Sequence, residues 1–149
     1  MKNRIGFLLA AGLLLIIVAA CGAQTATTPD IPRPSNPGAV GEAVALKGDP
    51  AAGEKVYVVH CYICHKGGVA NPGSVAGTVP SLNPVDDRLK SSDYKIFASN
   101  LDLFIEHGST PEVNPSGEML VLMPNWGDSG KLSPQQIADV ISYIISLNP

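Results

Sequence analysis

Apolar residues follow helical spacing in several parts of the chain, and no segment alternates over the length of a strand. The clearest helix is predicted at the C-terminal end, after Ser133-Pro134-Gln135-Gln136, which resembles a capping box. Its apolar face is formed by Ile137, Val140, Ile141, Ile144 and Ile145.

A second helix is predicted to begin at Asp49-Pro50, because Asp caps free N–H groups and Pro fits the first turn. This helix leads directly into Cys61. Ala52, Val56 and Val59 recur at helical spacing along this helix, and Gly53 and Tyr57 do so as well.

Between these two ends the pattern predicts two further short helices. One lies around residues 93–99, and the other is capped by Asn100 and stopped by Gly108. The buried face of the latter is formed by Leu101, Phe104 and Ile105. Residues 66–91 and 110–131 are predicted as loops because Gly, Pro and polar residues dominate them. The pattern therefore predicts an all-α domain with about four short helices.

The first 20 residues have the pattern of an export signal. A positive head, Met1–Arg4, precedes 14 apolar residues, Ile5 to Val18, which is fewer than the ~20 needed to cross a bilayer. Small residues before Cys21 then resemble the bacterial lipobox, in which the cysteine is acylated and becomes the mature N-terminus. We expect residues 1–20 to be a lipoprotein signal peptide and Cys21 to anchor the exported chain at the outer face of the cell membrane. An ordinary signal peptide and an uncleaved N-terminal helix are the alternatives.

Residues 21–48 lack apolar periodicity, and four prolines lie among polar residues there. They are predicted to form an extended tether between the anchor and a folded domain at residues 49–149. Its 27 residues after Cys21 span roughly 30 Å on average if flexible. A passive spacer is the alternative to a tether that lets the domain swing between partners.

The net charge and the length of the chain limit the classes of function that the sequence allows. The 149 residues carry a formal net charge of −3, and loss of Lys2 and Arg4 with the leader makes it about −5. No basic patch is present in the sequence, so nucleic acid is not an expected partner. A domain of about 100 residues with short helices buries a thin core, which favours a bound cofactor.

Cys61-Tyr62-Ile63-Cys64-His65 matches C-x-x-C-H, the attachment motif for haem c. In this chemistry the two thiols add across haem vinyl groups as thioethers, and the adjoining histidine becomes the proximal iron ligand. A thioredoxin-like dithiol needs a βαβ context that the pattern lacks. A zinc site needs further ligands, and only His60 and His107 remain. Haem is therefore the expected cofactor.

Residues 49–149 resemble a class I (monohaem) cytochrome c over the whole predicted domain. The segments that carry the resemblance occur in the family's order: Asp49 to Tyr57, Cys61 to His65, Pro80-Ser81-Leu82, Met123-Pro124 and the final helix. The resemblance implies an all-α fold of about four short helices wrapped around one covalently attached haem.

The resemblance also implies two specific contacts. Gly53 and Tyr57 meet Tyr143 where the first and last helices cross. The Pro80 carbonyl accepts a hydrogen bond from the nitrogen of His65 that lies far from the iron, which fixes the ring and strengthens it as a ligand.

The second axial ligand is expected from the C-terminal half of the chain. Met123 is the best candidate, because it lies 58 residues after His65 in a predicted loop and precedes Pro124. Met119 is the alternative, with packing as its expected role. A thioether ligand raises the reduction potential, and two filled axial positions leave no site for oxygen.

The remaining histidines and aromatic residues are expected to have lesser roles. His107 ends a helix and is expected to interact with helix carbonyls, with ligation of the iron as the alternative. His60 directly precedes the motif and cannot reach the distal face. The resemblance places Trp126 and Tyr94 in the haem environment, where they are expected to hydrogen-bond haem propionates, with packing against the haem edge as the alternative. It places Pro80 in the same environment.

The expected function is one-electron transfer without catalysis. Expected partners are the membrane and protein redox partners: a quinol-oxidising complex, a terminal oxidase or a reaction centre. A tethered carrier and a fixed subunit of a respiratory or photosynthetic complex, such as an alternative complex III-type assembly, both fit. The alternatives are a haem enzyme component, as in a peroxidase or dehydrogenase, and a haem-based ligand sensor.

Overall fold

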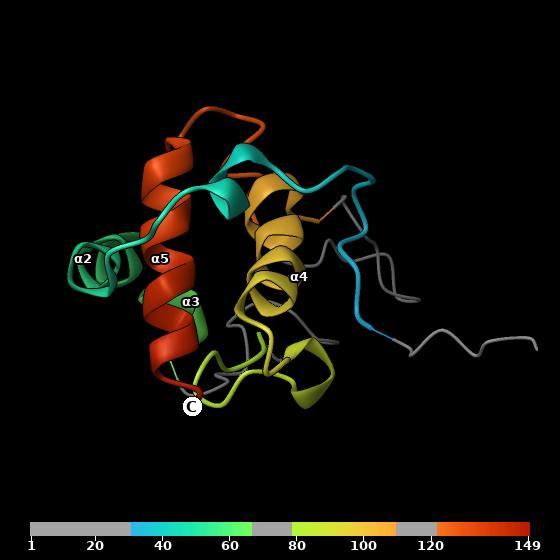
Figure 1. Ribbon diagram of the computed structural model, residues 1–149. Coiled ribbons are helices and arrows are strands. Elements are labelled where there is room, and N and C mark those ends of the chain that lie inside the picture. The colour runs from blue at the N-terminus through green and yellow to red at the C-terminus, as the bar shows by residue number, and fades with distance from the viewer. Residues whose placement is uncertain (1–30, 67–78, 110–121) are drawn as a thin grey trace, which may run out of the picture.

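The computed structural model describes residues 31–66, 79–109 and 122–149. Within these ranges the chain is helical and has no strand, so the predicted all-α fold is confirmed. The elements are η2 (Glu42–Ala45), α2 (Pro50–His60), α3 (Tyr62–His65), η3 (Asp87–Leu89), α4 (Tyr94–His107) and α5 (Pro134–Ser146). Figure 1 shows α5 between α2 and α4, with η2 beside the N-terminal end of α5. No helix in the described ranges has the length and apolar character needed to span a membrane.

The caps of α2 and α5 form as predicted. The Asp49 side chain accepts a hydrogen bond from the Ala51 N–H at 2.9 Å, and Pro50 occupies the first turn. At α5, the Ser133 hydroxyl accepts from the Gln136 N–H while the Gln136 side chain accepts from the Ser133 N–H. Both helices therefore begin where local side-chain chemistry satisfies free N–H groups.

The first and last helices cross at Gly53. A Cβ atom at this position would collide with the carbonyl oxygen of Asp139, so the two backbones approach this closely only because Gly53 has no side chain. Beside the crossing, the ring centroids of Tyr57 and Tyr143 lie 5.3 Å apart. Gly53 and Tyr57 thus meet α5 as the resemblance implies.

The two short helices predicted over residues 93–108 are one helix, α4. Asp93 caps it by accepting from two backbone N–H groups of its first turn. Asn100 is not a cap: it is buried within α4, and its side chain donates to the Leu89 carbonyl at 2.9 Å. This tertiary hydrogen bond offsets the low helix propensity of asparagine, and the sequence pattern contains no sign of it. Gly108, with φ of 62°, ends the helix as predicted.

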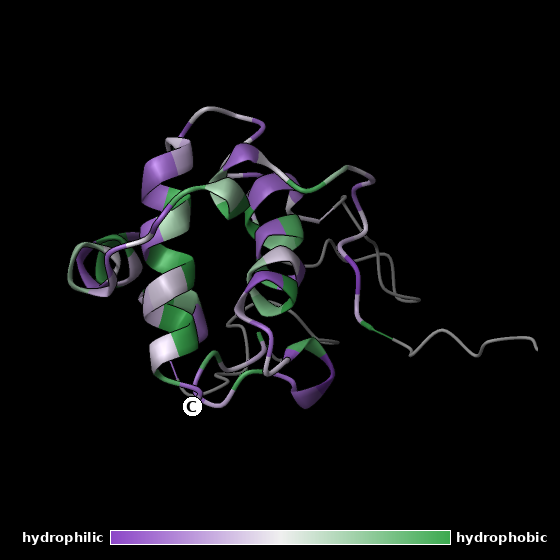
Figure 2. Cartoon of the chain, in the orientation of Figure 1, coloured by the Kyte–Doolittle hydropathy of each residue, from purple (hydrophilic) through white to green (hydrophobic). Residues whose placement is uncertain are grey.

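The apolar faces of α4 and α5 supply most of the core. Figure 2 shows apolar residues on the side of α5 that is turned toward α4. Phe104, predicted to be buried, is only half-buried because it borders the cavity described below. The buried residues of these two faces are Phe97, Leu101, Ile105, Ile137, Val140, Ile141 and Ile144.

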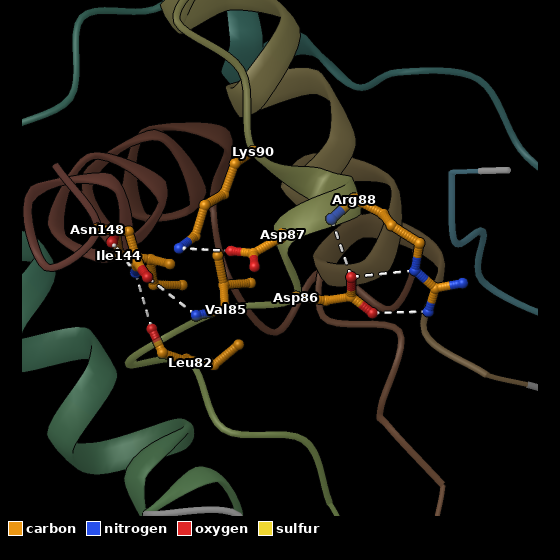
Figure 3. A network of polar contacts seen from close by, with 8 residues as sticks. All are labelled: Leu82, Val85, Asp86, Asp87, Arg88, Lys90, Ile144 and Asn148. Carbon is orange, nitrogen blue, oxygen red and sulfur yellow. Dashed lines mark hydrogen bonds and ion pairs between the residues drawn. The ribbon is translucent and has the colours of Figure 1, made fainter. Parts of the chain in front are cut away.

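Asn148 ties the loop before η3 to the end of α5 (Figure 3). Its Oδ1 accepts from the Val85 N–H at 2.9 Å, and its Nδ2 donates to the carbonyls of Leu82 and Ile144 at 2.9 and 2.8 Å. Asn148 is only 8% exposed, so these bonds satisfy backbone groups away from water. They hold in place the loop that also contains Pro80.

Residues 31–48, called here the N-terminal strap, belong to the segment predicted as an extended tether, residues 21–48, and they pack on the helical domain. The Gly41 N–H donates to Asp102 Oδ2 at 2.6 Å, and Ala43 in η2 is 2% exposed within the core. The strap binds through backbone groups, the Asn36 side chain and a few scattered apolar residues such as Ile31 and Ala43, so it has no periodic apolar face by which the sequence could reveal it. The predicted signal peptide and the predicted lipidation site, Cys21, lie outside the described residues.

Candidate haem-binding site

A cavity of about 580 Å³ lies between α3, α4 and the loops that contain Pro80 and Met123. This volume falls within the ~300–1,000 Å³ typical of cofactor sites. The walls are mostly apolar, so they suit a large apolar ligand with few polar groups. The apolar lining includes Val79, Leu82, Val85, Leu89, Leu101, Phe104, Ile105, Leu122 and Ile144.

Cys61, Cys64 and His65 all line this cavity. Cys61 lies between α2 and α3, and the His65 N–H donates to the Cys61 carbonyl at 2.9 Å to close the single turn of α3. Residues three apart in a helix lie on one side, which brings the two thiols to the same wall. The C-x-x-C-H spacing thus directs both thiols and the imidazole to one cavity.

The ring of His65 is held by the loop before η3. Its Nδ1 lies 2.8 Å from the Pro80 carbonyl oxygen, so the hydrogen bond implied by the resemblance is present. A carbonyl can only accept, so Nδ1 carries the proton and Nε2 keeps its lone pair. Burial lowers the pKa of His65 despite the Pro80 bond, which favours the neutral form that binds a metal.

Met123 lines the same cavity from the loop that precedes α5. Ser109 holds it on both sides: its hydroxyl accepts from the Met123 N–H, and its own N–H donates to the Met123 carbonyl, both at 2.9 Å. Sequence reasoning missed Ser109, because nothing in the local pattern links it to residue 123. Met119 lies outside the described residues, so the choice of Met123 as iron ligand stays a prediction.

Residues 48–144 match the family described as cytochrome c oxidase, cbb3-type, subunit III. The chain belongs to this family. Its class I-type cytochrome c domain binds one haem c covalently and transfers electrons through it. No curated protein and no solved structure matches the chain.

In this cytochrome c domain the free thiols are not poised for dithiol redox chemistry. Burial, with a smaller contribution from Cys64, raises the pKa of the Cys61 thiol to about 11. Dithiol oxidoreductases instead need a lowered pKa, because the thiolate is the nucleophile. A half-buried Cys61 thiol with a raised pKa, at the wall of an apolar cavity, agrees with thioether attachment.

Of the two aromatic residues assigned to the haem environment, the structure brings only Trp126 to the cytochrome's cavity. Its ring lies 5.1 Å from that of His60, and Lys131 Nζ is 5.8 Å from its centroid. Whether Trp126 bonds a haem propionate stays a prediction. Tyr94 is not among the described residues that line the cavity: it is the first residue of α4 and 48% exposed, so its place in the haem environment stays a prediction.

The side chain of His107 binds groups outside the candidate iron site. Its Nδ1 lies 2.9 Å from Asp128 Oδ2, and its Nε2 lies 2.7 Å from the Ala39 carbonyl oxygen. The expected interaction with helix carbonyls was wrong, because the partners come from the strap and from the loop after Met123. His60 packs on Trp126, as described above.

The residues present fit haem c. The cavity combines two thiols one helical turn apart, a neutral imidazole oriented by Pro80, and a thioether sulfur from a different segment. These are the donor types by which proteins attach and ligate such a haem. The bound haem supplies one iron-centred site for electron transfer. The chain's own residues orient the imidazole and surround the cofactor with apolar walls.

Proposed function

We propose that the protein is a lipid-anchored one-electron carrier that works as a fixed haem subunit of a respiratory or photosynthetic membrane complex. The observation that carries the proposal is that His65 and Met123, from separate segments, border one apolar cavity. With these two side chains as axial ligands, no position remains for oxygen or peroxide. The protein then transfers electrons without catalysing a reaction of its own.

The packed strap supports a fixed subunit over a long-range shuttle. With residues 31–48 on the domain, only residues 22–30 separate it from Cys21. Nine residues span at most about 30 Å even when fully extended. A domain on so short a link reaches few positions, so a single neighbouring complex is the natural partner.

The family description supports the same proposal, since it names a subunit of an oxidase. Protein redox partners of this chain are accordingly a terminal oxidase or a quinol-oxidising complex. The export signal and the cysteine of the lipobox support a location at the outer face of the cell membrane, with acylated Cys21 as the anchor.

A native gel of gently solubilised membranes, stained for covalent haem and followed by mass spectrometry, tests this function. We expect the haem of this chain at high mass, together with partner subunits in fixed stoichiometry. Haem found only near the mass of the monomer would instead identify a tethered carrier.

Two cysteine variants separate anchoring from haem attachment. Cys21→Ser is expected to keep covalent haem but to detach from the membrane, so that haem-stained protein appears in the soluble fraction. Cys64→Ser is the matched control, expected to stay in the membrane fraction with haem attachment impaired. Retention of Cys21→Ser in washed membranes would contradict the lipid anchor.

A further inference from the structure

Three segments of the chain meet at the C-terminal end of α4. The Trp126 and Asp128 N–H groups donate to the carbonyls of Ile105 and Glu106 at 3.0 and 3.1 Å. From the strap, Asn36 Nδ2 donates to the His107 carbonyl at 2.6 Å. The last carbonyls of a helix have no partner within it, so α4 uses them to bind the strap and the loop after Met123.

His107 is the side chain that joins the same segments. Its exposed fraction is 7%, and its two ring nitrogens face the Asp128 carboxylate at 2.9 Å and the Ala39 carbonyl at 2.7 Å. Both partners can only accept, so both bonds form together only when the ring is doubly protonated. The Asp128 hydrogen bond is the main cause that raises the pKa of His107, and burial opposes it.

The backbone directly after His107 sets the position of Met123. Gly108 has φ of 62°, and a Cβ there would collide with the carbonyl of Met123. Ser109 then makes the two hydrogen bonds that hold Met123 on both sides. A displacement of the end of α4, or of the loop that contains Asp128, therefore shifts Met123 at the wall of the cavity.

We infer that His107 is a positioning residue for Met123: its imidazolium clamps the strap and the Asp128 loop to the end of α4, and so holds the methionine at the cavity. This inference rests on the proposed ligation of iron by Met123. The clamp also links the strap, which follows the proposed anchor at Cys21, to the loop that contains Met123.

The clamp depends on pH because acidic groups surround it. The groups that face this end of α4 are Asp102 and Glu106 from α4 itself, Asp128 from the loop and Glu42 from η2. A raised pKa means that the stabilisation by His107 is complete below the ordinary histidine value of ~6.5. This stabilisation is lost as pH rises through the folded-state pKa of His107. The neutral ring then leaves only acidic groups at the C-terminal end of α4.

The experiment follows the sulfur-to-iron charge-transfer absorption of the oxidised holoprotein as a function of pH. Asp128→Asn keeps the shape of residue 128 but removes the charge that holds the imidazolium. We expect the midpoint pH for loss of the band to fall by about one unit, a tenfold larger population without methionine ligation, or ~1.4 kcal/mol. His107→Leu has no group that titrates at this position, so we expect a weaker band at every pH and loss of the pH dependence that His107 confers.

Asp87→Asn is the matched control, because it removes an exposed ion pair with Lys90 at the other end of α4. It is expected to keep the midpoint of the wild type. A wild-type midpoint in folded, haem-loaded Asp128→Asn would overturn the inference and leave ligation by Met123 intact. Absence of the band in the wild type, or its retention in Met123→Ala, would overturn the ligation and the inference together. Asp128 is 46% exposed, so its replacement keeps the test available even where His107→Leu does not fold.

Discussion

Gly53 of α2 and Asp139 of α5 lie in direct backbone contact, so close that any side chain on Gly53 would overlap the Asp139 carbonyl. The same region holds the Tyr57 and Tyr143 rings 5.3 Å apart. This crossing sets the position of α2, and α2 ends at the haem attachment motif. The crossing of α2 and α5, which is remote from the expected iron ligands, thus determines where Cys61 lies at the wall of the cavity.

Gly53→Ala is expected to lower the free energy of unfolding by about 1–3 kcal/mol, because overpacking forces the two backbones apart. Urea denaturation of the haem-loaded protein, followed by far-ultraviolet circular dichroism, measures this. Glu54→Ala, at the next and exposed position of α2, is the control and should stay within about 0.5 kcal/mol of the wild type. Equal stability of the two variants would show that the crossing can relax.

Met123→Ala is expected to abolish the sulfur-to-iron band and to lower the reduction potential by on the order of 0.1 V, within the ~0.8 V over which axial ligands act. The reduced variant should bind carbon monoxide, because one axial position is then open. Redox titration and absorption spectroscopy measure both changes.

The wild type and Met119→Ala are the controls for this substitution. Both should keep the band and resist carbon monoxide. Binding of carbon monoxide by the wild type would instead favour a ligand sensor, and loss of the band in Met119→Ala would move the ligand to residue 119.

Asn148→Ala is expected to cost about 2–4 kcal/mol of stability. The substitution leaves the Val85 N–H and the Leu82 carbonyl without their partner, and an unsatisfied buried group costs about 1–3 kcal/mol. Thermal and urea unfolding of the holoprotein measure the loss. Asp87→Asn breaks only an exposed ion pair and should cost ~0–1 kcal/mol. A cost below 1 kcal/mol for Asn148→Ala would mean that water replaces the three bonds.

Asp102→Asn is expected to stabilise the protein by about 1 kcal/mol at neutral pH. Asp102 is fully buried and its Oδ1 has no hydrogen-bond partner among the residues that the structure describes, while its Oδ2 accepts from the Gly41 N–H. An amide keeps the Gly41 bond and removes the burial of a charge.

The sign of the pH dependence distinguishes this explanation. Burial raises the pKa of Asp102, so the native state binds more protons than the unfolded state, and stability falls as pH rises above ~3.9 toward the folded-state value. The advantage of Asp102→Asn should therefore be absent near pH 3 and grow through this window. Glu42→Gln, on the exposed side of η2, should show no such growth. An advantage that is constant with pH would contradict a charge effect.

Several features of the fold and site follow from local sequence. The start of α5 at Ser133 depends on a capping box within four residues, and the start of α2 depends on Asp49 and Pro50. The attachment motif is equally local, since the turn of α3 alone places Cys61 and Cys64 together. These predictions succeeded because each rests on interactions between near neighbours in the chain.

Other features depend on contacts that local patterns do not contain. Asn100 looked like a cap but is the middle of α4, because the distant Leu89 carbonyl satisfies its side chain. Tyr94, expected in the haem environment, begins α4 and is 48% exposed. The surroundings of both residues depend on how one element packs against another, which a local pattern does not contain.

The sequence by itself determined the helical faces, the starts of α2 and α5 and the turn that brings the C-x-x-C-H motif together, because short-range sterics and hydrogen bonds decide them. Only the tertiary structure decided that residues 31–48 form a strap, and that His107 binds Ala39 and Asp128. Asn36 and His107 are 71 positions apart, and their contact exists only because the core packs α4 beneath the strap. Such pairings depend on the summed burial of many side chains, which no local window of sequence contains.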